Sequence, residues 1–164
     1  MSMDLAGDAS RGGAKVIYAA AGVTGFAFFL MELVWYRLLA PILGGTIFSF
    51  GLILTVALLG IGIGGSLYSP ILGKRPARYE VFAFTCILEA LLIALPFAIG
   101  DHIAVLAVLL RPFGTYGFWG LVGGWGLITS VVVLPAAIIA GIQFPLIIAL
   151  LGSGDKNVGR QTSV

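Results

Sequence analysis

Long apolar runs separated by short polar connections are the feature that most constrains this chain. They cover residues 16–40, 46–69, 81–99 and 116–151. About 20 apolar residues are needed for a helix to span the hydrocarbon core of a bilayer. A backbone inside that core must also satisfy its own hydrogen bonds, which a helix does. The runs therefore predict an all-α integral membrane protein.

The composition agrees with a lipid environment. Hydrophobic residues make up 60% of the 164 residues and charged residues 10%, whereas a soluble domain carries about 25% charged residues. Such a chain could not cover its own surface in water, so the lipid bilayer is its predicted surrounding. The net charge of +2 is small and its charges are scattered, which excludes nucleic acid as a partner.

The lengths of the runs predict four transmembrane helices plus one or two short interfacial helices. The run 116–151 is too long for one perpendicular span, and Pro135 and Gly141–Pro145 are natural break points. We therefore expect a span followed by an interfacial helix to about 151. The stretch Asp101–Arg111 is too short to cross and should lie near the outer surface. The predicted spans are 16–40, 46–69, 81–99 and 117–140.

The flanking segments complete the predicted organisation. Residues 1–15 are polar, small and glycine-rich, and we expect a disordered cytoplasmic tail. Residues 16–151 form a single transmembrane domain, and 152–164 form a second cytoplasmic tail. The first run is too long for a signal-peptide core, so it should remain as a membrane anchor.

Basic residues predict the orientation, because cytoplasmic connections carry an excess of Lys and Arg. With four spans and the N-terminus inside, Arg37 and Arg111 are the basic residues on the outer side. The predicted location is the inner (cytoplasmic) membrane, with both termini cytoplasmic. The basic residues then on the cytoplasmic side are Arg11, Lys15, Lys74, Arg75, Arg78, Lys156 and Arg160.

Glu32, Arg37 and Glu89 are charged residues inside predicted spans. A charge at the bilayer centre costs ~2.5–3.5 kcal/mol on insertion scales, so both glutamates should face other helices. Arg37 is five residues after Glu32 and on a different face of the helix. It can extend to the outer interface beside Trp35 and Tyr36. Two roles stay open for the glutamates, namely holding helices together or binding a proton or cation.

The second run contains glycines at helix-packing spacing. Gly60 and Gly64 are four residues apart, and Gly65 lies beside them. Small residues at this spacing let another helix approach closely. A phosphate-binding loop is excluded, because the GxxxxGK[ST] pattern is missing.

No catalytic residue, metal site or cofactor is predicted. The chain has one cysteine, Cys86, and one histidine, His102, too few for a Cys/His or Ser/His/Asp arrangement or a Cys-based metal cluster. The sequence leaves a bound lipid or pigment open. We expect no enzyme activity.

Several segments together resemble a known family. "GFAFFLMELVWYRLL" (Gly25–Leu39), "GIGIGGSLYSPILGKR" (Gly60–Arg75), "LEALLIALPFAI" (Leu88–Ile99) and "GIQFPLIIALL" (Gly141–Leu151) are similar to the membrane domain of the integral-membrane spermidine-synthase-like proteins. The resemblance covers nearly all of residues 22–160. It implies a helical membrane domain.

The resemblance carries over by position to a few residues. They are Glu32, Trp35, Arg37, Glu89 and the corner Gln143–Pro145. Longer family members continue with further helices and a Rossmann-like aminopropyltransferase domain. These 164 residues contain no glycine-rich nucleotide loop after a strand, so polyamine synthesis is not expected of them. The resemblance implies no activity for the membrane half.

Two functions are left by the sequence. The first is a non-catalytic accessory or structural subunit that docks against other membrane-protein subunits, for instance in an energy-transducing complex. The alternative is a small transporter, or a module that binds polyamine or protons through Glu32 and Glu89.

Overall fold

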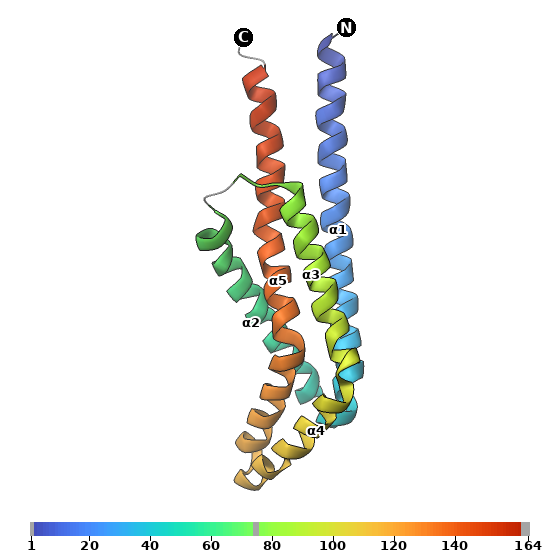
Figure 1. Cartoon of the computed structure of the whole chain (residues 1–164), viewed down its shortest axis with the longest axis vertical. Helices are drawn as coiled ribbons and strands as arrows, with labels where there is room; N and C mark the ends of the chain where they lie inside the picture. The colour runs from blue at the N-terminus through green and yellow to red at the C-terminus, as the bar shows by residue number, and fades with distance from the viewer. Residues whose placement is uncertain (1, 74–75, 162–164) are drawn as a thin grey trace.

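The computed structural model describes residues 2–73 and 76–161 as an all-helical chain. Figure 1 shows the helices running along one long axis, with both chain ends at the same end of the molecule. Lys74 and Arg75, which contribute to the predicted orientation, lie outside the described residues. The elements are α1 (Ser2–Leu43), α2 (Ile47–Leu72), α3 (Tyr79–Ala98), α4 (Gly100–Leu110), the 3-10 helix η1 (Arg111–Tyr116) and α5 (Phe118–Gln161).

Four of these helices are long and apolar enough to cross a membrane, which confirms the predicted fold class. The candidate spans lie in α1, α2, α3 and α5. No strand occurs in the described part of the chain. The candidate spans are Tyr18–Leu43, Ile47–Leu72, Tyr79–Ala98 and Phe118–Gly152.

Helix α1 begins at Ser2, where the sequence predicted a disordered tail over residues 1–15. At about 1.5 Å per residue, 42 helical residues extend about 63 Å, twice the ~30 Å core of a bilayer. Figure 1 shows the N-terminal part of α1 and the C-terminal part of α5 projecting beyond the connection between α2 and α3. The apolar part of α1 starts at Tyr18, close to the predicted start of the first span.

A tight turn joins α1 to α2 and sets them antiparallel. Gly44 and Gly45 both have positive φ angles, 84° and 62°, which glycine adopts without steric cost. Thr46 caps α2 by accepting a hydrogen bond from the backbone of Ser49, and the Ser49 hydroxyl donates to the carbonyl of Leu43 at 2.8 Å. The first two spans are therefore fixed to each other at this end.

Helix α5 is continuous from Phe118 to Gln161 and contains both Pro135 and Pro145. The predicted end of the fourth span at 140, with a separate interfacial helix to about 151, is therefore not found. A proline in a buried membrane helix is tolerated because neighbouring helices and small adjustments satisfy the freed backbone group. The 35 residues Phe118–Gly152 also exceed what a perpendicular span needs, which implies tilt.

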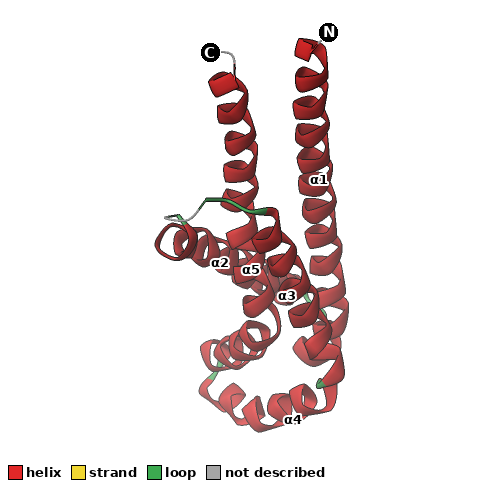
Figure 2. Ribbon diagram, turned by 45° about the horizontal axis from the view of Figure 1, so that its top comes forward, coloured by secondary structure: helices red, strands yellow, loops and turns green. Residues whose placement is uncertain are grey.

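Helix α4 and η1 form the base of the molecule, at the end opposite the termini (Figure 2). The 11 residues of α4 are too few to span a bilayer. Ile103 of α4 is buried against the hydrophobic core. Gly117, with a φ of 82°, reverses the chain into α5.

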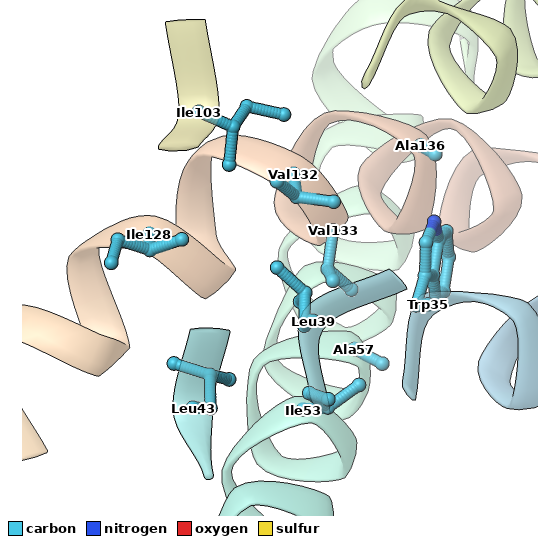
Figure 3. Packing of buried hydrophobic residues seen from close by; sticks show 10 residues of the cluster. All are labelled: Trp35, Leu39, Leu43, Ile53, Ala57, Ile103, Ile128, Val132, Val133 and Ala136. Atoms are coloured by element: carbon cyan, nitrogen blue, oxygen red, sulfur yellow. The ribbon is translucent and has the colours of Figure 1, made fainter. Parts of the chain in front are cut away.

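Helix α5 forms the centre of the fold and packs against every other helical element. Figure 3 shows the hydrophobic cluster where α1, α2, α4 and α5 meet, with Trp35 and Leu39 directed at Val133 and its neighbours on α5. In the most apolar stretch of α5, 50% of the residues are buried, whereas in those of α1 and α3 only 17% are buried. Helices α1 and α3 therefore each pack on α5 and leave most of their own residues exposed.

Candidate functional site

Glu32 lies on the face of α1 that is turned toward α5. It is 9% exposed, and Trp35 and Leu39 on the same face are 1% and 0% exposed. These residues follow each other at three and four positions, the spacing of one helix face. The cost of a carboxylate facing lipid accounts for this orientation.

Glu89 of α3 and Gln143 of α5 form a buried acid–amide pair. Gln143 Nε2 donates a hydrogen bond of 2.7 Å to Glu89 Oε2. Gln143 is 2% exposed and Glu89 is 9% exposed, so the pair lies inside the bundle. An amide donor lowers the cost of burying a carboxyl group, because the acceptor keeps a hydrogen bond.

Glu32, Glu89 and Gln143 all line one cavity, although they come from three different helices. The cavity has a volume of ≈ 430 Å³, and its remaining lining is mostly apolar. Phe29 and Phe144 at its edge are 69% and 68% exposed, so it opens at the side of the bundle. The structure thus brings the two predicted glutamates to one site and adds an amide.

Two oxygen atoms at this site have no hydrogen-bond partner among the described residues. They are Glu32 Oε1 and Gln143 Oε1, and both are buried. Leaving a buried polar atom unpaired costs about 1–3 kcal/mol. Both orphaned atoms are acceptors, so the site lacks donors.

Trp35 was expected beside Arg37 as an interfacial aromatic residue, but its indole is directed into the bundle. Trp35 is fully buried and packs edge to face on Phe28, with ring centroids 5.9 Å apart. Its Nε1 has no partner within the described chain. The burial of Trp35 follows from the helix face that it shares with Glu32 and Leu39.

Arg37 is exposed on α1 and does not contribute to the cavity. Tyr36 beside it is half-buried, and its hydroxyl donates to the carbonyl of Gly45 at 3.1 Å. Arg37 and Glu32 therefore lie on different faces of α1, as expected from their spacing.

Gly60 and Gly64 lie where α2 crosses α5. A Cβ added at Gly60 would lie 2.5 Å from Cβ of Ala137, and one added at Gly64 would lie 2.9 Å from Cα of Gly141 and closer still to the carbonyl oxygen of Ile138. Gly65 is less restricted, with its nearest contact at 3.8 Å. The two backbones thus approach each other closely, with the methyl group of Ala137 between them at Gly60 and backbone against backbone at Gly64.

Helix α2 carries a second set of small residues on the opposite face, which we call the outer stripe of α2. Its members are exposed and are spaced by three, four or seven positions, so they share one face about 180° from Gly60. A Cβ added at Gly51 or Gly62 would meet nothing within 4 Å. The outer stripe consists of Gly51, Thr55, Gly62, Ser66 and Ser69.

Sequence reasoning misses the role of Gln143, because it treats Gly141–Pro145 as a corner. The signal in the sequence that could have identified it is the helical spacing of four residues that the structure shows to be buried. Ala136, Gln143, Ile147 and Leu150 are buried at helical spacing on both sides of Pro145. Such a stripe through a proline indicates that the helix continues.

Within the described residues, no group of three or more His, Cys, Asp or Glu side chains is placed to hold a metal ion. Comparison of the chain with protein-family models, with curated proteins and with solved structures gave no match. The resemblance to the membrane domain of the spermidine-synthase-like proteins therefore stays a proposal.

Proposed function

We propose that the chain is a non-catalytic, membrane-embedded subunit that docks through the outer stripe of α2 against other membrane-protein subunits. The observation that carries this proposal is the pair of small-residue faces on α2. One face, with Gly60 and Gly64, is filled by α5, and the outer stripe is left open.

Lipid tails are as apolar as leucine, so apolar side chains alone do not drive membrane helices together. Membrane helices instead associate where glycine, serine and threonine let two backbones approach. Thr55 and Ser66 bond to the carbonyls of Gly51 and Gly62 at 2.7 and 2.8 Å, so their hydroxyls are already paired. Apart from the exposed Leu58 between Thr55 and Gly62, the outer stripe thus presents small side chains to one further helix.

We further propose that the chain lies in the inner (cytoplasmic) membrane with both termini cytoplasmic. An even number of crossings places both termini on one side, as in Figure 1, and the bias of Lys and Arg favours the cytoplasmic side. We propose no catalytic role.

The test is purification from native membranes in mild detergent, with the assembly followed by native electrophoresis. Gly62→Leu should release the chain from its assembly, because a leucine on the outer stripe separates the two backbones. The fold should survive, since a Cβ at Gly62 meets nothing within 4 Å.

Gly22→Leu is the matched control. Gly22 is an exposed glycine of α1 with open space around a Cβ, and it should leave the assembly intact. A wild-type protein that migrates as a stable monomer, or as an oligomer of this chain alone, would contradict the proposal.

The cavity favours a second candidate function, the binding or transport of a proton or cation. Two carboxyl groups and an amide converge there within candidate membrane spans, and intramembrane acids often mark ion or substrate paths. In proteoliposomes, this function predicts a proton- or cation-linked flux that Glu32→Gln removes. Glu80→Gln, an exposed carboxylate of α3 outside the cavity, should leave that flux unchanged.

A further inference from the structure

We propose that the cavity lined by Glu32, Glu89 and Gln143 binds an organic cation that has an ammonium head and an apolar body. The inference rests on the second candidate function and names the class of its ligand. It is independent of docking, because the outer stripe of α2 does not line the cavity.

The polar end of the cavity calls for a donor. Gln143 already uses Nε2 to donate to Glu89, which leaves Gln143 Oε1 and Glu32 Oε1 as buried acceptors without a partner in the described structure. Glu32 is 9% exposed and Gln143 is 2% exposed, so water reaches them poorly. An ammonium group carries several N–H donors and no acceptor, which matches these oxygens.

The charge of the site also selects a cation. Arg37 is exposed and does not line the cavity, and the lining contains no Lys, Arg or His. An ionised Glu32 or Glu89 at this depth has no cationic side chain as its partner in the described part of the chain. A bound ammonium would lower the cost of keeping a carboxylate inside the membrane.

The size and lining of the cavity extend the ligand beyond a bare ion. The volume of ≈ 430 Å³ exceeds by far the ~30 Å³ that one water occupies, and it lies in the range of small-molecule pockets. Phe28, Phe29 and Phe144 contribute aromatic rings to the wall. Aromatic rings attract cations as well as apolar groups, so they suit an amine with an apolar body.

The open side of the cavity gives such a ligand a route. Phe29, Phe144 and Ile148 at its edge are each more than half exposed, so the cavity opens through a side wall that lipid would contact. An amphipathic amine partitions into the membrane interface and can enter from there, with its head toward Glu32 and its body along the phenylalanines.

The experiment uses the full chain in detergent micelles and ¹⁹F NMR of three probes. They are 4-fluorobenzylammonium, its trimethylated analogue, which lacks N–H donors, and the neutral 4-fluorotoluene. We expect saturable binding of the first probe. The affinity of each of the other two probes should be lower by about tenfold or more, because each loses charged hydrogen bonds. Equal affinity for all three would overturn the proposal.

Variants of the cavity residues test whether the amine binds in the cavity. Glu32→Gln and Glu89→Gln should each weaken 4-fluorobenzylammonium binding about tenfold or more, and Glu80→Gln should leave it unchanged. Because a buried glutamate can affect folding, Gly25→Leu provides a second arm. Gly25 lines the cavity and a Cβ there meets nothing within 4 Å, so leucine should fill the space and block binding without removing a charge. Gly22→Leu, one turn earlier, is its matched control.

Failure of this inference can be separated from failure of the second candidate function. A Glu32-dependent proton flux without amine binding would overturn the ligand class and leave a proton site in place. Displacement of the probe by potassium chloride, but not by tetramethylammonium chloride at equal ionic strength, would assign the site to an alkali cation and also overturn the proposal. Unchanged amine binding in Glu32→Gln, Glu89→Gln and Gly25→Leu would remove the cavity as the site.

Discussion

The two faces of α2 make opposite predictions for the same substitution, glycine to alanine. At Gly64 the added Cβ would lie 2.9 Å from both Cα of Gly141 and the carbonyl carbon of Ile138, well inside ordinary van der Waals separation. These are backbone atoms, so relief requires the two helices to move apart. At Gly62, on the outer stripe, the same methyl meets nothing within 4 Å.

The magnitudes follow from this difference. Overpacking costs about 1–3 kcal/mol, and rigid backbone contacts place Gly64→Ala at the upper end. Alanine in a helix interior gains about 0.5–1 kcal/mol over glycine. We therefore expect Gly64→Ala to lower the free energy of unfolding by about 2 kcal/mol. Gly62→Ala should leave the isolated chain unchanged or raise its free energy of unfolding by up to about 1 kcal/mol.

Unfolding of the purified chain in mixed micelles by increasing amounts of denaturing detergent, followed by circular dichroism, measures both values. The comparison cancels helix propensity, because both sites lie in one helix and receive the same methyl group. Equal stability of the two variants would refute the close crossing of α2 and α5.

Three further predictions concern the acid–amide pair, the turn and the topology. Gln143→Leu should lower the free energy of unfolding by about 1.5–3 kcal/mol, because Glu89 loses its buried donor. The double variant Glu89→Leu/Gln143→Leu should be less destabilised than Gln143→Leu alone. An unchanged free energy of unfolding in Gln143→Leu would show that the 2.7 Å hydrogen bond contributes little to stability. Thr46→Ala should cost about 1 kcal/mol in the same unfolding assay, since the cap of α2 is lost, and no change would argue against the capping interaction. In a Cys86→Ser background, Ser163→Cys should react with an impermeant thiol reagent from the cytoplasmic side only. Thr115→Cys in η1 should react from the opposite side only. Labelling of both cysteines from one side would contradict four crossings.

Run length was enough to predict the membrane fold, because a spanning helix needs a stretch of apolar residues that few other structures require. The exact ends were harder. Proline weakens a helix in water, so Pro135 and Pro145 suggested a break, yet α5 continues through both. Gly141, expected to belong to a corner, instead lets α5 approach α2, where its added Cβ would lie 2.8 Å from Cα of Ile61.

The candidate site could be predicted one residue at a time but not as a group. The cost of a charge in lipid was sufficient to orient Glu32 and Glu89 inward. Their meeting with Gln143 depends on how α1 and α3 pack against α5, and Gln143 is 54 positions from Glu89. No local pattern in the sequence encodes that distance. Trp35 shows the converse, since its three-residue spacing from Glu32 and four-residue spacing from Leu39 are enough to indicate its burial.

Photo-crosslinking in the native membrane tests the proposed docking most directly. A benzophenone amino acid would replace Thr55 or Ser66 on the outer stripe of α2, and Leu91 on the exposed face of α3 would serve as the control position. If the outer stripe docks against another subunit, irradiation gives protein–protein adducts of one defined mass from Thr55 and Ser66, and lipid adducts from Leu91. Lipid adducts alone from all three positions would contradict it.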